Sequence, residues 1–436
     1  MSFSVYLNEL INKNHQSFKQ YPGLRWMNPY QAIDLETQRN ETLASFTEEV
    51  QWAFKKTKPY INSISRGCQL CGEGEWSCLF ITGLCNANCF YCPTTQQADH
   101  LPTTQQFNFE KAGDYADYIN KMKFKGVSFS GGEPLLFFDR LVEYVRTIRQ
   151  NCAPDIYIWM YTNGKLLTKE KAEILSEMGI DEIRFDIGAT DYKFDTIQFA
   201  QGKIPHITVE IPAVPEKTER IKSLLPELIK CGVTNLNLHQ MRLTSHNVSK
   251  LEKHNYTYLH GEAPVVAQSE LSALEIIQHV DQHKIPLGVN YCGFQYKNRF
   301  QKSGYRKKLA HMLADNQVWI TEAGYLGEIS GVVNEESESI TRESFLRESD
   351  RFTSVLIRFS GIMLELVFGL GYDLTFGDNH YKITRKAALK TIEIPQEDFP
   401  ELIKIFVGES TEAPECEDLF NVWRHVQIES GMRDYQ

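Results

Sequence analysis

Three absences narrow the kind of protein that this sequence encodes. With a net charge of −10, it lacks the general basic excess of nucleic-acid-binding proteins, so nucleic acid is disfavoured as a partner unless a local basic patch exists. It also lacks a long uncharged apolar run, because the most apolar late stretch, residues 354–374, contains Arg358 and Glu365. That stretch predicts a buried amphipathic helix and no membrane span. Internal repeats and low-complexity tracts are absent as well.

The cysteines are crowded rather than scattered. Residues 1–20 lack a basic segment followed by an apolar core, so no secretory signal is evident and we expect a cytoplasmic protein. In a reducing compartment the ten cysteines are poor candidates for disulfides. Six of them fall between Cys68 and Cys92, and this crowding indicates a metal or cluster site.

Strand-like and helix-like runs alternate from Leu79 to about Asn290. The expected strands are residues 79–82, 126–130, 156–161, 182–186, 207–211, 235–239 and 286–290. The expected helices between them are residues 109–123, 139–151, 169–178, 216–231 and 270–283. This alternation predicts an α/β fold of βαβ units with a parallel sheet, as in a partial or full α/β barrel. The reactive face of such a barrel lies at the carboxyl ends of its strands.

We expect three parts along the chain. Residues 1–67 form an N-terminal extension, with a short helix over residues 47–56. Residues 68–315 form the barrel with its cysteine-rich entry. Residues 316–436 form a small C-terminal α+β module. Its expected elements are a hairpin over residues 318–333, a helix over residues 352–370 and a terminal helix near residues 416–428.

The segment Cys85-Asn-Ala-Asn-Cys89-Phe-Tyr-Cys92 directly follows the first expected strand of the barrel. Three thiolates on one compact loop can bind three irons of a [4Fe–4S] cube, which leaves the fourth iron open to a small chelating molecule. A structural zinc site needs four ligands, usually from two CxxC pairs. The spacing therefore favours an iron–sulfur cluster over zinc.

Two further motifs follow in order: Ser130-Gly131-Gly132-Glu133-Pro134 and Thr162-Asn163-Gly164, each at the end of an expected strand. With the cysteines, they resemble the radical S-adenosylmethionine (SAM) superfamily over roughly residues 79–292. The resemblance implies a (β/α)6-type partial barrel with a [4Fe–4S] cluster whose open iron binds SAM. It also implies reductive cleavage of SAM to methionine and a 5′-deoxyadenosyl radical, which abstracts hydrogen from a substrate. A reductant such as flavodoxin or ferredoxin would supply the electron.

The same resemblance assigns residues to SAM. Tyr91, the aromatic residue before the last cysteine, matches the position near the adenine. The backbone of Gly131 and Gly132 would approach the SAM amino group, and Glu133 could accept an ammonium hydrogen bond. Polar groups at strand ends are candidates for the ribose, the carboxylate or the adenine: Thr162, Asn163, Asp186 and Glu210.

A second set of cysteines, Cys68, Cys71 and Cys78, precedes the motif and is not part of the family pattern. They could be inert buried thiols, a zinc knuckle, or ligands of an auxiliary iron–sulfur cluster or a single metal. Cys292, at the end of the last expected strand, is the candidate fourth ligand. An auxiliary cluster could accept an electron from a substrate radical or bind the substrate. We interpret the isolated cysteines as structural: Cys152, Cys231 and Cys416.

Candidate substrate contacts lie near the barrel mouth. His239 and Gln240 end an expected strand, and Arg242 could pair with a carboxylate or phosphate. The histidines beyond His246 are expected to be solvated loop residues. The basic run from Lys297 to Lys308 is expected to be the solvated face of a helix rather than a peptide or nucleic-acid site.

Residues 290–309 resemble uncharacterised relatives of pyruvate formate-lyase activating enzyme. The extra cysteines and the C-terminal module depart from the activating enzymes, which puts glycyl-radical activation in doubt. We therefore expect a radical SAM enzyme acting on a peptide, a protein or a small molecule, with its class among oxidoreductases, lyases and transferases left open. The alternatives are an RNA-modifying radical SAM enzyme and a non-catalytic metal-binding protein.

Overall fold

The computed structural model describes residues 3–105, 107–261 and 263–313 and, further on, seven strands between Val318 and Ile392. The chain divides into two compact units. Residues 14–302 belong to the first unit, and residues 1–13 and 303–426 belong to the second. The first unit therefore includes most of the expected N-terminal extension and ends before residue 315.

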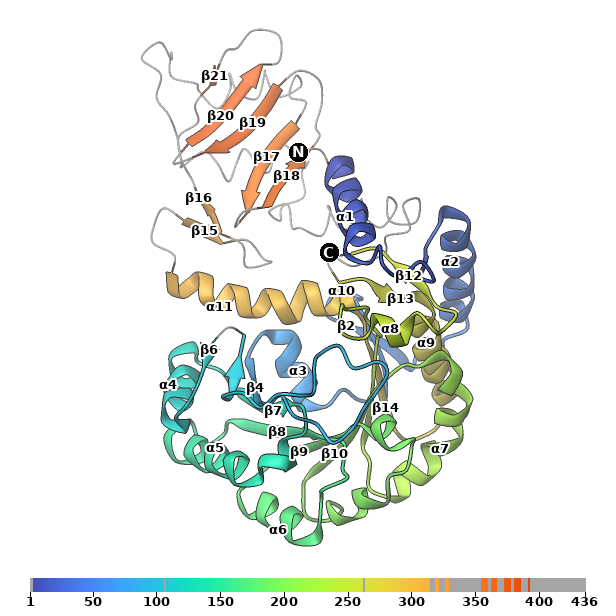
Figure 1. Cartoon of the computed structure of the whole chain (residues 1–436), viewed down its shortest axis with the longest axis vertical. Helices are drawn as coiled ribbons and strands as arrows, with labels where there is room; N and C mark the ends of the chain where they lie inside the picture. The colour runs from blue at the N-terminus through green and yellow to red at the C-terminus, as the bar shows by residue number, and fades with distance from the viewer. Residues whose placement is uncertain are drawn as a thin grey trace. The chain divides into compact units, whose positions relative to one another are not determined.

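An eleven-stranded sheet forms the centre of the first unit, in the order β2-β3-β14-β11-β10-β9-β8-β7-β4-β5-β6. Seven consecutive strands run parallel, and antiparallel strands flank them at both edges of the curved sheet (Figure 1). The parallel strands are β4 (Trp76–Thr82), β7 (Gly126–Gly131), β8 (Tyr157–Thr162), β9 (Glu182–Phe185), β10 (His206–Pro212), β11 (Asn235–His239) and β14 (Gly288–Cys292). The predicted partial barrel and all its strands are confirmed.

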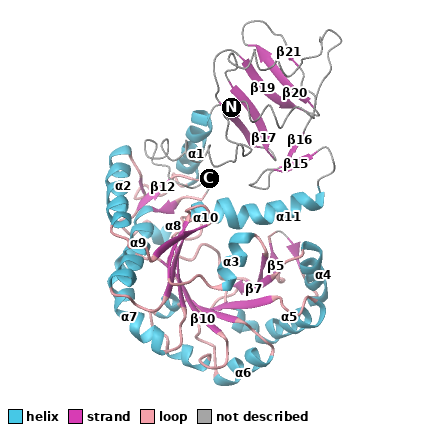
Figure 2. Cartoon of the chain, turned by 180° about the vertical axis from the view of Figure 1, so that it is seen from behind, coloured by secondary structure: helices cyan, strands magenta, loops and turns pink. Residues whose placement is uncertain are grey.

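Amphipathic helices cover the outer face of this sheet (Figure 2). Their bounds are α4 (Ala112–Met122), α5 (Phe138–Asn151), α6 (Lys169–Glu177), α7 (Thr218–Lys230) and α9 (Ala267–Gln282). In α5, Leu141, Val145 and Ile148 recur at helical spacing and are fully buried, while the opposite face carries charge. The five predicted helices are confirmed, with ends within a few residues of expectation.

The segment expected as a helix over residues 47–56 is instead part of the sheet. Strands β2 (Val50–Ala53) and β3 (Lys58–Ile61) form an antiparallel hairpin, and β3 pairs with β14. Phe54, Lys55 and Lys56 all have positive φ angles, which a helix does not allow. Helix α3 (Arg66–Glu73) follows, begins at the N-cap Ser65 and ends at the left-handed Gly74.

A smaller three-stranded sheet lies within the same unit, formed by β1 (Arg25–Trp26), β12 (Thr257–Leu259) and β13 (Val265–Val266). Helix α2 (Pro29–Ala44) starts with a capping box at Asn28, and α8 (Val248–Leu251) precedes β12. His260 is 2% exposed and stacks on Trp26 with ring centroids 4.3 Å apart. The expectation that the later histidines are all solvated is therefore wrong for His260.

The second unit contains residues 3–13 of helix α1 (Phe3–Ser17), the whole of helix α11 (Ser303–Leu313) and two small sheets. The hairpin of β15 (Val318–Ile320) and β16 (Leu326–Glu328) was expected. The other sheet has the order β18-β17-β19-β20-β21. Its strands are β17 (Ser354–Phe359), β18 (Ile362–Leu366), β19 (Tyr372–Gly377), β20 (His380–Arg385) and β21 (Thr391–Ile392).

This second sheet overturns the helix expected over residues 352–370. Its apolar residues form strands because short apolar runs rich in β-branched and aromatic residues favour pleated structure, and periodicity alone does not separate them from buried helices. The helix predicted near Cys416 lies outside the described residues. Among the helices that the structure describes, none is long and apolar enough to cross a membrane.

Candidate active site

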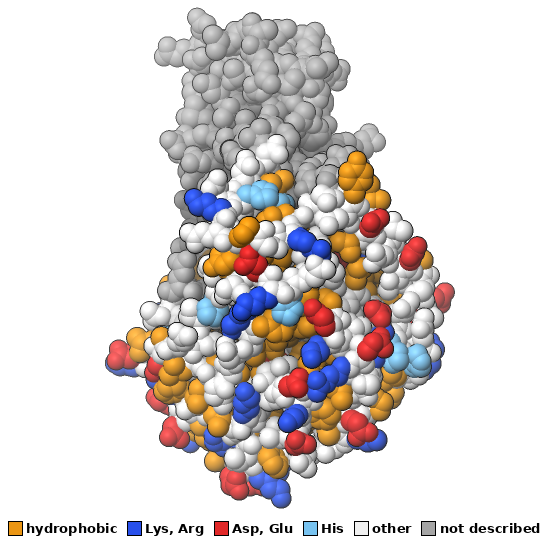
Figure 3. All heavy atoms as spheres, turned by 45° about the vertical axis from the view of Figure 1, so that its right-hand side comes forward, with side chains coloured by type: hydrophobic (Ala, Val, Ile, Leu, Met, Phe, Trp, Pro, Cys, Tyr) orange, Lys and Arg blue, Asp and Glu red, His pale blue; other side chains and the backbone are white. Residues whose placement is uncertain are grey.

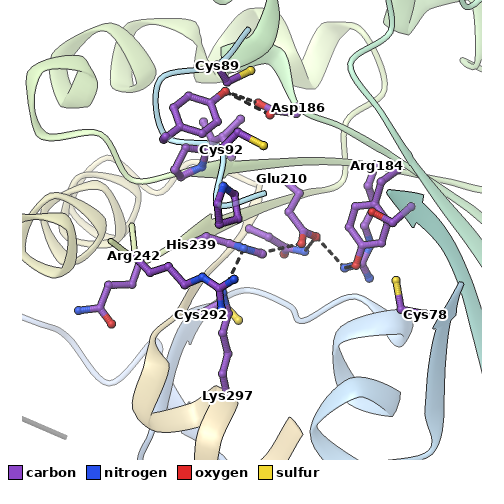
Figure 4. Close-up of a pocket in the computed structure, with 18 of the residues that line it drawn as sticks. Cys78, Cys89, Cys92, Arg184, Asp186, Glu210, His239, Arg242, Cys292 and Lys297 are labelled. Carbon is purple, nitrogen blue, oxygen red and sulfur yellow. Dashed lines mark hydrogen bonds and ion pairs between the residues drawn. The ribbon is translucent and has the colours of Figure 1, made fainter. Parts of the chain in front are cut away.

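A cavity of about 480 Å³ opens at the carboxyl ends of the parallel strands in the first unit. Both sets of cysteines contribute to its wall, as do residues that end β7, β8, β10, β11 and β14. Figure 4 shows Cys89 and Cys92 on one side of the cavity and Cys292 on another, with Glu210 and His239 between them. The position agrees with the reactive face of an α/β barrel.

The loop after β4 carries Cys85, Cys89 and Cys92. The Gln96 side chain donates to Cys92 Sγ at 3.0 Å, and the Ala87 amide faces Cys85 Sγ at 3.4 Å. Burial, together with the neighbouring Asp186, raises the pKa of Cys89 to about 12. Three soft sulfur donors on one loop match the ligands of an iron–sulfur cluster, whose binding displaces the thiol protons. Within the described part of the chain, no three Cys, His, Asp or Glu side chains are grouped so as to hold a single metal ion.

This cysteine loop is tied to the segment before α8. The Asn247 amide donates to the carbonyl of Tyr91 at 3.1 Å, and Thr244 Oγ1 donates to the carbonyl of Pro93 at 3.1 Å. Lys250 Nζ reaches the Cys89 carbonyl at 3.3 Å. These contacts between distant parts of the sequence position the cysteine loop, and the motif alone gave no signal for them.

Gly131 and Gly132 permit a close approach between β7 and the start of the cysteine loop. Gly131 has a φ of +120°, and a Cβ there would lie 2.3 Å from the Thr82 carbonyl oxygen. A Cβ on Gly132 would lie 1.9 Å from the Leu84 carbonyl oxygen. The Gly132 amide donates to Thr82 O at 2.8 Å. Any larger residue would therefore push the cysteine loop away from β7.

Glu133 is held by hydrogen bonds within the protein. Its side chain is 0% exposed and accepts three hydrogen bonds, from the Leu135 amide at 3.0 Å, Thr162 Oγ1 at 2.8 Å and the Asn163 amide at 2.8 Å. Burial raises its pKa even though these donors lower it. Glu133 therefore fixes the end of β8, and its contact with the SAM ammonium stays a prediction.

Thr162, Asn163 and Asp186 all lie in the cavity wall, as their positions at strand ends predicted. Asn163 Nδ2 lies 3.7 Å from Cys85 Sγ and donates to Asn86 Oδ1 at 2.7 Å. Tyr91 OH donates to the Asp186 carboxylate at 3.0 and 3.1 Å. Burial raises the pKa of Asp186 to about 6. The structure thus brings the candidate SAM residues and the cysteine loop to one place.

The second cysteine group consists of Cys68 and Cys71 on α3 and Cys292 at the end of β14. Burial, with the charges of Cys292 and Cys68, raises the pKa of Cys71 to about 12. A π-helical turn, Lys297–Lys302, packs on α3, and its Gln301 donates to Cys71 Sγ at 3.2 Å. Such turns are frequent at functional sites.

Cys78 lies apart from this group. It sits on β4, where a hydrogen bond with Ser128 partly offsets the burial that raises its pKa to about 12. Figure 4 places it beside Arg184 and away from Cys292. The structure therefore groups Cys68, Cys71 and Cys292, while Cys78 as a ligand stays a prediction.

A buried ionic network lies beside Cys78, and the sequence gave no signal for its centre, Arg184. Arg184 is 2% exposed and pairs with Glu182 at 2.9 Å and with Glu210 at 2.7 Å. It also faces Cys68 Sγ at 3.6 Å. Although burial raises it, the pKa of Glu210 is held below its usual value by Arg184 and His239. Glu210 is thus engaged within the protein, which weakens it as a ribose ligand.

The residues predicted to contact substrate differ in their surroundings. His239 Nε2 donates to Glu210 Oε1 at 2.6 Å, and its Nδ1 lies 3.4 Å from Lys297 Nζ. Gln240 Oε1 accepts from the Phe294 amide at 3.0 Å, so this side chain braces the segment after β14. Arg242 lines the cavity. Lys297 also lines it, so this first residue of the basic run does not belong to a solvated face as expected.

Comparison with known proteins agrees with this site. Residues 79–238 match the model of the Radical SAM superfamily, and this span includes the cysteine loop and the five parallel strands that follow it, β7 to β11. The matched residues therefore form a radical SAM domain, and the comparisons support an enzyme of this kind.

Individual relatives can then be named. The chain is 28% identical over 315 residues to the "Putative glycyl-radical enzyme activating enzyme MJ0021" of Methanocaldococcus jannaschii, which covers 68% of this chain and 80% of that protein. It is 29% identical over 107 residues to the GTP 3',8-cyclase of Listeria monocytogenes, covering 24% of this chain and only 31% of that enzyme.

A solved structure of Streptococcus suis SuiB bound to S-adenosylmethionine is also similar. It is 13% identical, with a TM-score of 0.38, and the match covers 63% of this chain and 67% of SuiB.

Proposed function

We propose that the chain reductively cleaves SAM at a [4Fe–4S] cluster held by Cys85, Cys89 and Cys92, and that the resulting 5′-deoxyadenosyl radical abstracts hydrogen from a substrate. The observation that carries this proposal is the shared cavity wall, where the three thiols face Gly131, Thr162, Asn163 and Asp186. When bound, the cluster supplies one electron and one open iron. A small reductant protein such as flavodoxin or ferredoxin would deliver the electron.

The surrounding residues would bind and orient SAM. The backbone at Gly131 and Gly132 lines the cavity next to the cysteine loop, which suits the polar amino acid end of SAM. Asn163 reaches toward Cys85 and suits the same end. Tyr91 and Asp186, joined by a hydrogen bond, suit the adenine and the ribose hydroxyls. Glu133 would act indirectly, by holding Thr162 and Asn163 in place.

We further propose a second iron–sulfur cluster on Cys68, Cys71 and Cys292. The support is the convergence of these three thiols on one wall of the same cavity, although they come from α3 and β14. A single tetrahedral zinc would need a fourth ligand, and Figure 4 shows Cys78 beside Arg184 and away from Cys292. Two groups facing one cavity place a substrate within reach of both.

The substrate would be a peptide, a protein or a small molecule. The name of the Methanocaldococcus jannaschii relative makes a protein that receives a glycyl radical one candidate. No observation favours RNA: on the face seen in Figure 3, Lys and Arg alternate with Asp and Glu and form no continuous basic patch.

The test is anaerobic purification of the full chain, followed by reduction with dithionite in the presence of SAM. We expect a brown protein that forms 5′-deoxyadenosine and methionine. Cys89→Ala should abolish deoxyadenosine formation, while Cys231→Ala, at the partly exposed end of α7, should retain it. Deoxyadenosine formation by Cys89→Ala at the wild-type rate would contradict the proposal.

A further inference from the structure

Lys58 on β3 is a buried cation without a hydrogen-bonding partner. Its side chain is 0% exposed, and its Nζ contacts the face of the Tyr296 ring, 4.4 Å from the centroid. It also belongs to the cavity wall. Burying an ammonium group without an anion carries a large desolvation penalty, so the folded protein needs a negative charge near this atom.

No carboxylate fills this need in the described residues, where Lys58 forms no ion pair. The ionisable groups that its charge influences most are thiols and one imidazole: Cys68, Cys71 and His239. Tyr296, which lies under the ammonium, donates its hydroxyl to the Cys68 carbonyl at 3.2 Å. The anion that best fits is therefore a set of thiolates at the second cysteine group.

Other neighbours of this group also favour negative charge on sulfur. Gln301 donates to Cys71 Sγ at 3.2 Å, and Asn237 donates to Cys68 Sγ at 3.2 Å. Arg184 faces Cys68 Sγ at 3.6 Å, but its charge is matched by two carboxylates, Glu182 and Glu210. Lys297 lies near Cys292 and Cys71, and Glu210 also acts on its charge. Among the described residues, Lys58 is therefore the buried cation of this group that lacks a carboxylate partner.

The first cysteine group has no fully buried, unpaired cation of this kind among the described residues, although carboxylates lie near both groups, Glu182 and Glu210 near Cys68 included. Asp186 lies near Cys89 and Glu133 lies near Cys85, and both carboxylates disfavour negative charge on sulfur. The cations on this side are Arg242, near Cys92, and Lys250, at the Cys89 carbonyl. Both are partly exposed, so water screens them more than it screens the fully buried Lys58.

We propose that Lys58 is the fixed counter-charge of the second cluster and keeps its reduction potential above that of the first cluster. The inference rests on the proposed function, because it requires both clusters. Reduction adds a negative charge, so a buried cation and hydrogen bonds to sulfur stabilise the reduced state and raise the potential. Lys58 acts through the cluster and is a positioning charge rather than a catalytic residue.

This order of potentials sets a direction for electron flow. After the 5′-deoxyadenosyl radical has taken one hydrogen atom, the substrate radical would pass one electron to an oxidised cluster held by Cys68, Cys71 and Cys292 and would release one proton to solvent. The substrate then loses two electrons and two hydrogens in total, and SAM ends as methionine and 5′-deoxyadenosine. One electron would enter through the first cluster and one would be taken up by the second, so the electrons balance. The reaction class is a dehydrogenation.

The test is a redox titration of the anaerobic full-length protein without SAM, followed by electron paramagnetic resonance. We expect two iron–sulfur signals, and the one that Cys71→Ser removes should have the higher midpoint potential. Lys58→Met should shift that midpoint to lower potential and leave the other midpoint unchanged. Lys58→Arg, which keeps the charge, should restore it. Lys58→Gln provides a second neutral variant if Lys58→Met does not assemble the second cluster.

Different results of this titration would contradict the second cluster and the role of Lys58 separately. If wild-type protein shows only the signal that depends on Cys89, the second cluster fails and Lys58 loses its role, while SAM cleavage at the first cluster stands. If both signals exist but neither neutral variant lowers the second midpoint, the counter-charge proposal is overturned and the second cluster stands. A second midpoint below the first, or a stable glycyl radical as product, would overturn the direction of electron flow.

Discussion

The two cysteine groups face the same cavity but are built in different ways. Cys85, Cys89 and Cys92 lie on one loop, whereas Cys68 and Cys71 come from α3 and Cys292 from the far end of the chain's parallel sheet. The first group is flanked by Glu133 and Asp186, and the second by lysines and amide donors. A local motif can therefore be read from sequence, but a site assembled by tertiary structure can be recognised only in part.

The contrast between the two cysteine groups would fail completely if the second group held no cluster, so this prediction has the largest expected effect. Replacing Cys71 by Ser should remove about four irons per chain, the content of one [4Fe–4S] cluster, because Cys71 is a central thiol of that group. Part of the reductive SAM cleavage should remain, since the first group is intact. Iron and sulfide analysis gives the answer.

Cys78→Ser is the matched control for this prediction. It is also a buried thiol near Arg184, but it lies apart from the group. We expect it to keep the full iron content. Iron loss equal to that of Cys71→Ser would show that Cys78 is also a ligand, as the sequence predicted.

Gly132→Ala has a smaller expected effect and tests whether the close approach of β7 positions the first cysteine group. Gly132→Ala places a Cβ 1.9 Å from a backbone oxygen, so the cysteine loop must move and the protein should lose about 1–3 kcal/mol of stability, as for overpacked sites. The first cluster should assemble poorly while the second is retained. Thermal unfolding and the two resonance signals measure both effects.

Gly113→Ala is the control for that substitution. Gly113 lies in α4, and a Cβ there would meet nothing within 4 Å. We expect a gain of about 0.5–1 kcal/mol from helix propensity and two unchanged clusters. Equal destabilisation by both substitutions would refute the close-approach argument.

The smallest expected effect concerns Glu133. Glu133→Gln keeps the shape but weakens three charge-assisted hydrogen bonds to Leu135, Thr162 and Asn163. Losing about 1.5 kcal/mol of such bonding should weaken SAM binding about tenfold, with the iron content unchanged. Equilibrium dialysis with SAM measures this, and the exposed Glu110→Gln serves as the control. Iron loss in Glu133→Gln would show a structural role for the cluster itself.

Much of the fold was predictable because the barrel repeats a simple pattern. Every parallel strand and covering helix of the barrel carries its own hydrophobic periodicity, and each was found within a few residues. Two predictions of helix failed. At residues 47–56 the positive φ angles of Phe54 to Lys56 form a tight turn that composition does not reveal. At residues 352–370 the short apolar runs around Arg358 and Glu365 fit strands as well as a helix.

The site could be predicted where its residues lie at the carboxyl ends of strands. Thr162, Asn163 and Asp186 reach the cavity because parallel strands bring their carboxyl ends to one edge. Lys58, Arg184 and Gln301 were missed, since each lies inside an element and acquires its role only from neighbours distant in sequence. Glu210 lines the cavity as its position at a strand end predicted, but the partners of Glu133 and Glu210 could not be foreseen.

The most direct measurement is the iron and sulfide content of anaerobically purified wild-type protein, combined with deoxyadenosine formation after reduction with SAM present. The account predicts about eight irons and eight sulfides per chain, corresponding to two [4Fe–4S] clusters, and SAM cleavage. About four irons with SAM cleavage would contradict the second cluster. Zinc in place of iron, with no deoxyadenosine, would contradict the assignment of both cysteine groups.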